Sequence, residues 1–163
     1  MTPREEFLAA RRAQAERLYR GEETPHRSCG IALAETFGCA TPAYQSLRRG
    51  GITGEGPCGA IQAGVLLLGE LFGDADPTGP VTPALREAVV RYRAALGLSV
   101  SGPLETSCNV RVASLGEFMG PARKSYCTSL AGEVAEAVAG VLWDLDHPAA
   151  RVTSALPGAR LPH

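Results

Sequence analysis

The sequence predicts an all-α protein, a single compact bundle of about six or seven helices around a buried apolar central helix. Two observations support this fold class. Apolar residues recur at helical spacing in several segments, and each such segment begins at a capping residue or proline and ends near a glycine. With 163 residues the chain is long enough for one domain with a real core. We expect the helical domain to span residues 1–147, followed by a flexible, proline-containing tail at 148–163.

Capping residues predict where each helix begins and ends, starting with the first helix of the chain. Thr2 and Glu5 form a capping box around Pro3, and Gly21 ends the helix. Ser28 and Ser107 are further candidate N-caps, and Thr82 precedes a helix whose apolar face recurs at helical spacing. The expected helices cover 3–20, 29–37, 42–49, 58–72, 83–96, 108–119 and 125–146.

The central helix follows a glycine-rich loop, residues 50–59, that leads into Pro57 and Cys58. Glycine reaches positive φ without penalty, so such a loop suits a tight path. The helix after it is apolar on almost every side and is therefore expected in the core. At about 15 residues it is too short to cross a bilayer, which takes about 20. The G-x-G-x-x-G pattern at 54–59 follows no predicted strand, which argues against a dinucleotide site.

Composition excludes several classes of function. A net charge of −1 gives no support for binding nucleic acid or an acidic membrane surface. The N-terminal stretch has no apolar segment typical of a signal peptide, so we expect a cytoplasmic protein. Thiols stay reduced in that compartment, so five cysteines point to metal or redox chemistry more than to structural disulfides.

Four of the five cysteines share one expected setting, the first turn of a helix: Cys29, Cys58, Cys108 and Cys127. The free N–H groups and the dipole of a helix start stabilise an anion, so we expect these thiols to ionise readily and to serve as nucleophiles or metal ligands. Cys39 follows a helix end and is expected to stand apart. The alternative is that the cysteines are small buried hydrophobic residues.

The spacing of these cysteines includes no C-x-x-C pair. It therefore does not match a zinc ribbon, a thioredoxin motif, a ferredoxin motif or a haem-attachment motif. We expect no haem.

With its glycine loop and cysteine order, the chain resembles the C_GCAxxG_C_C family of redox-active proteins. The matching features are Cys29, the glycine loop leading to Cys58 and Gly59, then Cys108 and Cys127, over about residues 24–146. The chain departs at Ala63, where the family more often has glycine. The resemblance implies a small helical protein with four functional cysteines in a redox or metal-centre role. The family is similar in part to split-Soret cytochromes, whose haem motif is absent here.

Three hypotheses follow. The four thiols bind an iron–sulfur cluster or a metal ion, or cycle between dithiol and disulfide, with Gly56 and Gly59 allowing the backbone close to a cluster or ligand. Alternatively, they hold a structural zinc ion in a scaffold without catalysis. In the third, Cys58 is the nucleophile of a thiol enzyme, with His26 or His147 as its base. We favour the first, with a redox partner protein, no nucleic-acid or membrane partner, and a homodimer left open.

Overall fold

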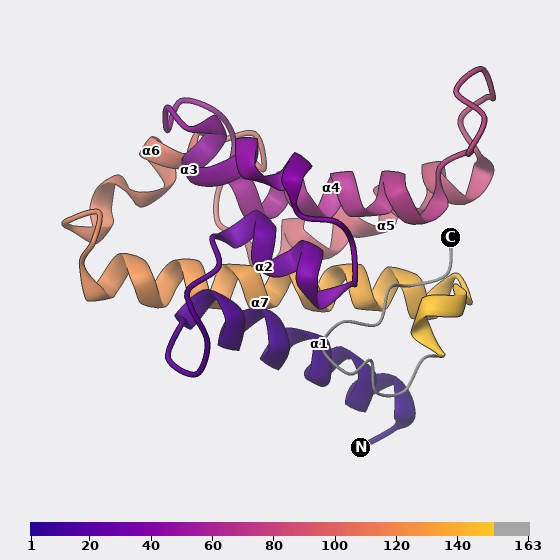
Figure 1. Cartoon of the computed structure of the whole chain (residues 1–163), viewed down its shortest axis with the longest axis horizontal. Coiled ribbons are helices and arrows are strands. Elements are labelled where there is room, and N and C mark those ends of the chain that lie inside the picture. The colour runs from indigo at the N-terminus through magenta and orange to yellow at the C-terminus, as the bar shows by residue number, and fades with distance from the viewer. Residues whose placement is uncertain (152–163) are drawn as a thin grey trace.

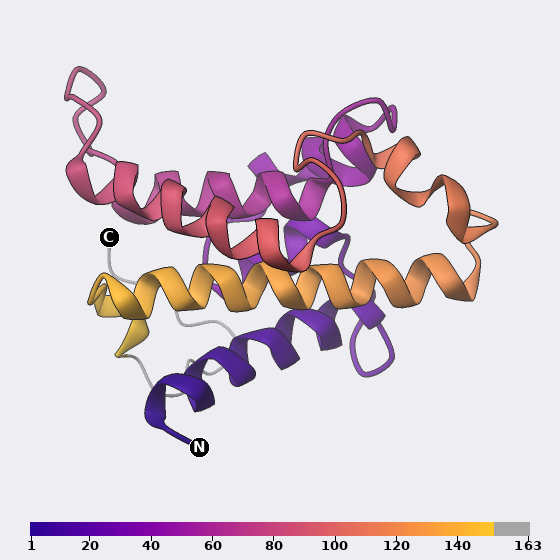
Figure 2. The same cartoon turned by 180° about the vertical axis from the view of Figure 1, so that it is seen from behind.

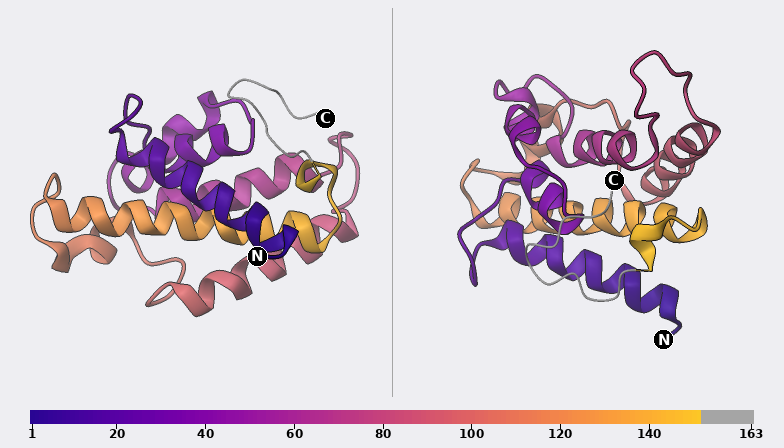
Figure 3. Two further views of the ribbon diagram at one scale, coloured as in Figure 1. Left: turned by 90° about the horizontal axis from the view of Figure 1, so that it is seen from below. Right: turned by 45° about the vertical axis from the view of Figure 1, so that its right-hand side comes forward.

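The longest helix, α7 (Pro121–Asp144), runs through the middle of the protein in the computed structural model, which describes residues 1–151 (Figure 1). Helix α1 (Pro3–Arg20) packs along one side of α7 and crosses it obliquely (Figure 3). Helices α2 (Cys29–Thr36), α4 (Gly59–Phe72) and α5 (Pro83–Ser99) pack against α7 from its other sides (Figure 2). Within the described residues there are seven α-helices and no strand, which confirms the predicted all-α fold.

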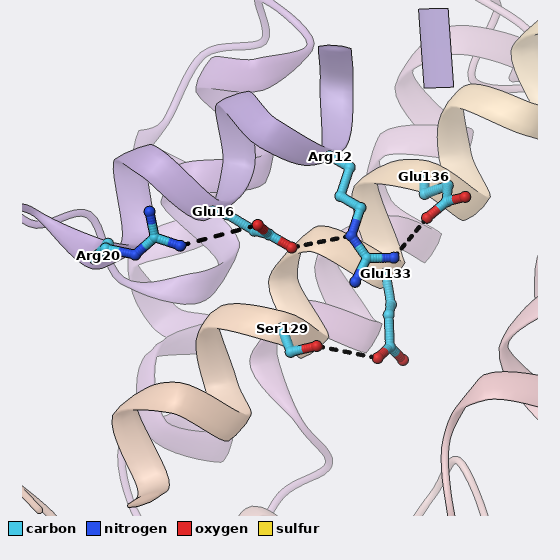
Figure 4. Close-up of polar contacts among 6 residues, drawn as sticks. All are labelled: Arg12, Glu16, Arg20, Ser129, Glu133 and Glu136. Carbon is cyan, nitrogen blue, oxygen red and sulfur yellow. Dashed lines mark hydrogen bonds and ion pairs between the residues drawn. The ribbon is translucent and has the colours of Figure 1, made fainter. Parts of the chain in front are cut away.

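Helix α1 begins and ends as predicted. The Thr2 hydroxyl accepts a hydrogen bond from the Glu5 amide at 3.2 Å, and the Glu5 carboxylate accepts one from the Thr2 amide at 2.7 Å. Gly21 ends the helix in the left-handed region, with φ of 70°. Across the interface with α7, Arg12 donates to Glu136 at 2.8 Å and also to Glu16 on its own helix at 3.0 Å (Figure 4).

The core forms where small residues of α4 allow close packing. Leu67 and Leu68 are fully buried, and the predicted apolar stripe of α5 buries Tyr92. A Cβ atom on Gly64 would lie 2.0 Å from the Tyr92 hydroxyl, so only glycine leaves room for this ring. The hydroxyl donates to the Ile61 carbonyl at 2.8 Å, which satisfies it in the core.

Several boundaries differ from those predicted. Segment 42–49 forms a 3₁₀ helix, Pro42–Leu47, followed by the short turn α3 (Arg48–Gly51). Helix α5 continues through Gly97 to Ser99, so this glycine is not its cap. The segment after Ser107 is shorter than predicted: α6 (Cys108–Val112) gives way to a 3₁₀ turn at Ala113–Leu115.

Helix α7 begins at Pro121 rather than near Ser125. A proline is well suited to the first helical position, and that signal is a better guide here than Ser125. As a consequence Cys127 lies in the second turn of its helix and not in the first, as predicted.

The chain beyond α7 is described only as far as residue 151. Pro148–Ala150 forms a 3₁₀ turn whose two alanines are buried against the core, so the first residues of the expected tail are part of the packed domain. The rest of that tail, 152–163, lies outside the described residues.

Within residues 1–151, no helix is both long enough and apolar enough to cross a membrane.

Candidate thiol site

The four cysteines singled out in the sequence line one cavity, although they are spread from residue 29 to residue 127. The cavity measures about 30 Å³, room for a group of a few heavy atoms. We call it the thiol pocket. Its walls include, besides Cys29, Cys58, Cys108 and Cys127, the residues Tyr19, Arg49, Gly50, Gly59, Ala60, Arg111, Val112, Arg123, Tyr126 and Leu130. Cys39 is not among them, as predicted.

Four separate elements bring the thiols to the pocket. Cys29 is the first residue of α2, Cys58 is the N-cap of α4, and Cys108 is the first residue of α6. Cys127 comes from the second turn of α7. Three of the four thiols therefore lie at helix starts, and the fourth reaches the same cavity from the side of a long helix.

The glycine loop positions Cys108. The Gly56 carbonyl accepts a hydrogen bond from the Cys108 amide at 2.8 Å, and the Gly50 carbonyl accepts one from the Gly56 amide at 3.0 Å. Gly50 has φ of 60°, and a Cβ atom there would lie 2.5 Å from the Cβ of Cys108. Both the backbone conformation and the close contact require glycine at this position.

The two glycines expected near a ligand differ in role. Gly59 lines the pocket, and a Cβ atom on it would lie 2.2 Å from the Leu47 carbonyl oxygen and 3.0 Å from the Cys29 sulfur. Gly56 is not among the residues that line the pocket. A Cβ atom on it would lie 2.8 Å from the Gly50 carbonyl oxygen, so its smallness serves the packing of the loop on itself.

Burial governs the ionisation of three of these thiols, contrary to the prediction that they ionise readily. It raises the pKa of Cys29 to about 12, and it also raises the pKa values of Cys58 and Cys127. Helix-start amides do oppose this shift at Cys29 and Cys58, and the charge of Arg123 opposes it at Cys127, but desolvation is the larger effect. The thiols of Cys29, Cys58 and Cys127 are therefore neutral near pH 7.

The thiols also affect one another. Ionisation of Cys58, Cys127 or Cys108 raises the pKa of Cys29. Cys127 and Cys108 act on Cys58 in the same way, and Cys108 acts on Cys127. All six pairs are thus close enough for their charges to interact, which makes the four thiols one electrostatic unit.

Four cysteine sulfurs are a chemically suitable set of ligands for a metal centre. Four thiolates are the ligands of iron–sulfur clusters and of structural zinc. Within residues 1–151, no group of three or more His, Cys, Asp or Glu side chains is close enough together to hold a single ion. The four cysteines line a cavity instead of meeting at one point.

Neither histidine considered as a base reaches the thiol pocket. His26 contacts the Tyr19 carbonyl through Nδ1 and packs edge-on to the Tyr19 ring, with the ring centroids 5.0 Å apart. His147 packs against Phe72 and its Nε2 contacts the Leu71 carbonyl at 3.0 Å. Because the pocket wall contains no histidine, the thiol-enzyme hypothesis lacks the base it requires.

Sequence reasoning missed the arginines of the pocket wall. Arg111 lies three residues after Cys108, and Arg123 lies four residues before Cys127. Residues three or four apart share a helix face, so these spacings were a usable signal. Arg49, in a left-handed conformation with φ of 50° within α3, had no such signal.

A comparison of the chain with protein-family models, with curated proteins and with solved structures finds no match. The resemblance to the C_GCAxxG_C_C family therefore stays a prediction that the cysteine and glycine pattern alone supports.

Proposed function

We propose that this chain is a redox-active protein whose working site is the thiol pocket. One observation carries the proposal: four cysteines from α2, α4, α6 and α7 line the same small cavity. Burial alone does not account for this arrangement, because Cys39 is also partly buried yet lies elsewhere.

Of the redox forms open to four thiols, the geometry favours an iron–sulfur cluster. A single ion needs its ligands to meet at one point, whereas these side chains surround a cavity. Cys29, Cys58, Cys108 and Cys127 would hold the cluster, which when bound supplies one-electron chemistry. The chain's own contribution is to fix the four thiols and exclude water from most of their surface.

Dithiol–disulfide cycling is the second form. Two thiols would lose two electrons and two protons as one S–S bond forms, and a disulfide of a partner protein would accept both and become a dithiol. The raised pKa values make this exchange slow at neutral pH, because the thiolate is the attacking species. That argument ranks this form below the cluster.

The test is iron, acid-labile sulfide and zinc analysis, with an absorption spectrum, on protein purified without oxygen. We expect iron with sulfide, lost in each of four variants: Cys29→Ser, Cys58→Ser, Cys108→Ser and Cys127→Ser. Cys39→Ser is the matched control, since that thiol lies outside the pocket, and it should retain the cluster. Thermal unfolding of all five variants separates loss of the site from loss of the fold.

Other outcomes would change the proposal in defined ways. Zinc alone, with a colourless protein that melts on chelation, would favour a structural zinc site. No metal, with reversible loss of two thiols per oxidation step, would leave dithiol–disulfide cycling. If the four pocket variants keep the same metal content and thiol reactivity as Cys39→Ser, the proposed site is wrong.

Partner and location follow from this proposal as further expectations. A cluster or dithiol that cycles needs an electron donor and acceptor, which we propose is a partner protein. A cytoplasmic setting would keep the thiols reduced. A homodimer is also a proposal, to be checked by light scattering.

A further inference from the structure

Three arginines line the thiol pocket together with the cysteines: Arg49, Arg111 and Arg123. They come from three different elements, α3, α6 and α7. The pocket wall contains no aspartate or glutamate. The wall therefore carries three cationic side chains and no carboxylate.

These guanidinium groups also lack acidic partners elsewhere in the described part of the chain. In residues 1–151 none of the three is within ion-pair distance of a carboxylate. Arginines of α1 behave differently: Arg12 pairs with Glu16 and Glu136, and Arg20 lies 4.0 Å from Glu16 (Figure 4). The fold thus pairs arginine with acid on one face of α1 and leaves the pocket arginines uncompensated.

Two of these like charges are held near each other by one aromatic ring. The guanidinium carbon of Arg123 lies 3.6 Å from the centroid of Phe118, and that of Arg49 lies 4.4 Å from it. Like charges repel, so holding both against one ring costs free energy unless a negative group joins them. The cation–π contacts offset only part of this cost.

Hydrogen bonds hold the terminal guanidinium nitrogens of Arg111 and Arg123 in place and leave the Nε donors free. Arg111 donates to the Ser101 carbonyl at 3.1 Å and to the Pro103 carbonyl at 2.7 Å, and Arg123 donates to the Phe118 carbonyl at 2.9 Å. The Nε atom of each of these arginines is buried and has no partner. A buried donor without an acceptor is costly, and a bound acceptor would remove that cost.

We infer that the thiol pocket binds a small oxyanion, held by Arg49, Arg111 and Arg123 beside the four thiols. Guanidinium groups bind oxyanions through paired N–H donors, and three of them suit an ion with three or four oxygens. The cavity of about 30 Å³ limits the ligand to a few heavy atoms, which excludes a nucleotide. The inference rests on the proposed function in taking this pocket as the working site. A cavity of this size admits one occupant at a time, so the oxyanion is the ligand of the protein without a cluster.

The test is isothermal titration calorimetry with sulfate, phosphate and sulfite on the full chain in its metal-free, reduced form, at constant ionic strength set with potassium chloride. We expect at least one of these oxyanions to bind with saturation and chloride not to compete at that strength. Arg49→Gln is the first variant, because Arg49 is exposed and its loss removes a cation–π contact with Phe118 but no core packing. Thermal unfolding of the variant checks that the fold is kept. We expect about tenfold weaker binding in Arg49→Gln, and a larger loss when Arg123→Gln is added.

Arg86→Gln is the matched control, since Arg86 is an exposed arginine of α5 outside the pocket wall. It should bind the oxyanion as the unaltered protein does. If oxyanion binding is weakened equally in Arg86→Gln and Arg49→Gln, the effect is one of overall net charge, and the inference is overturned. The absence of saturable binding would overturn it as well. Cys58→Ser separates the two proposals: we expect it to lose the redox site but to retain oxyanion binding within a few-fold.

Discussion

The close approach of Gly59 to the Leu47 backbone can be tested by adding one methyl group to Gly59. Gly59→Ala places a Cβ atom 2.2 Å from the Leu47 carbonyl oxygen and 3.0 Å from the Cys29 sulfur. Ordinary contact begins at 3.4 Å, so either α4 or the Leu47 backbone must move by about 1 Å. Because the Leu47 oxygen belongs to the backbone, the strain cannot be relieved by turning a side chain.

The same substitution on the same helix provides the control. Gly69 lies on the exposed side of α4, and a Cβ atom on it meets nothing within 4 Å. Glycine to alanine in a free helical position stabilises by about 0.5–1 kcal/mol, because the unfolded chain loses less freedom on folding. Overpacking costs about 1–3 kcal/mol, which exceeds that gain at Gly59.

We therefore expect opposite signs from two chemically identical changes. Gly59→Ala should lower Tm by about 3–6 °C, and Gly69→Ala should raise it by about 1–3 °C, for a chain of this length. Differential scanning calorimetry measures both, and thiol labelling before and after shows whether Gly59→Ala also opens the pocket. Stabilisation by both variants would refute the close approach of α4 to Leu47, and with it the geometry derived for the thiol pocket.

Three further predictions test the ionisation state, a helix cap and the packing of α7. Burial raises the pKa of Cys29 from 9.0 to about 12, so the unfolded chain loses this proton first and stability should fall between pH 9 and 12; urea unfolding across that range should show a smaller fall in Cys29→Ala. Thr82→Ala removes a hydroxyl that accepts from the Leu85 amide at 3.0 Å, and it should cost about 1 kcal/mol in urea unfolding, whereas an unchanged midpoint would contradict the cap. Leu142→Ala, at a fully buried position in the last turn of α7, should cost about 2–5 kcal/mol at any salt concentration. Glu136→Gln, at a partly exposed ion pair of the same helix, should cost less than about 1 kcal/mol and nothing at 1 M salt.

Local signals predicted the fold well because they act within a few residues. The capping box at Thr2, the cap at Thr82 and the apolar stripe ending in Leu96 each depend on contacts inside one helix. The helix containing Cys127 was misplaced because Ser125 and Pro121 both offer start signals, and sequence alone does not rank them. The grouping of four cysteines was predicted from their shared position at helix starts, a premise that holds for only three of them.

The ionisation of the thiols could not be predicted from the same local signals. A helix start favours an anion by about 0.3–1 kcal/mol, less than one pKa unit. Desolvation depends on the tertiary structure, and it raises the pKa of Cys29 to about 12 despite the amide of Gly30. The arginines of the pocket were missed for a related reason, since Arg49 reaches the site only through the left-handed backbone of α3.

Burial and the arginines act on the pocket in opposite directions, and this opposition bears on what the site can hold. Burial raises the pKa values of Cys29, Cys58 and Cys127, while the charge of Arg123 opposes this shift at Cys127. A metal group bound by four thiolates is negative overall, as is an oxyanion, and either would meet the uncompensated guanidinium charges. A neutral occupant would leave those charges unopposed. The pocket is therefore better suited to a negative occupant than to a neutral one, and both proposed occupants, a thiolate-bound cluster and an oxyanion, meet that condition.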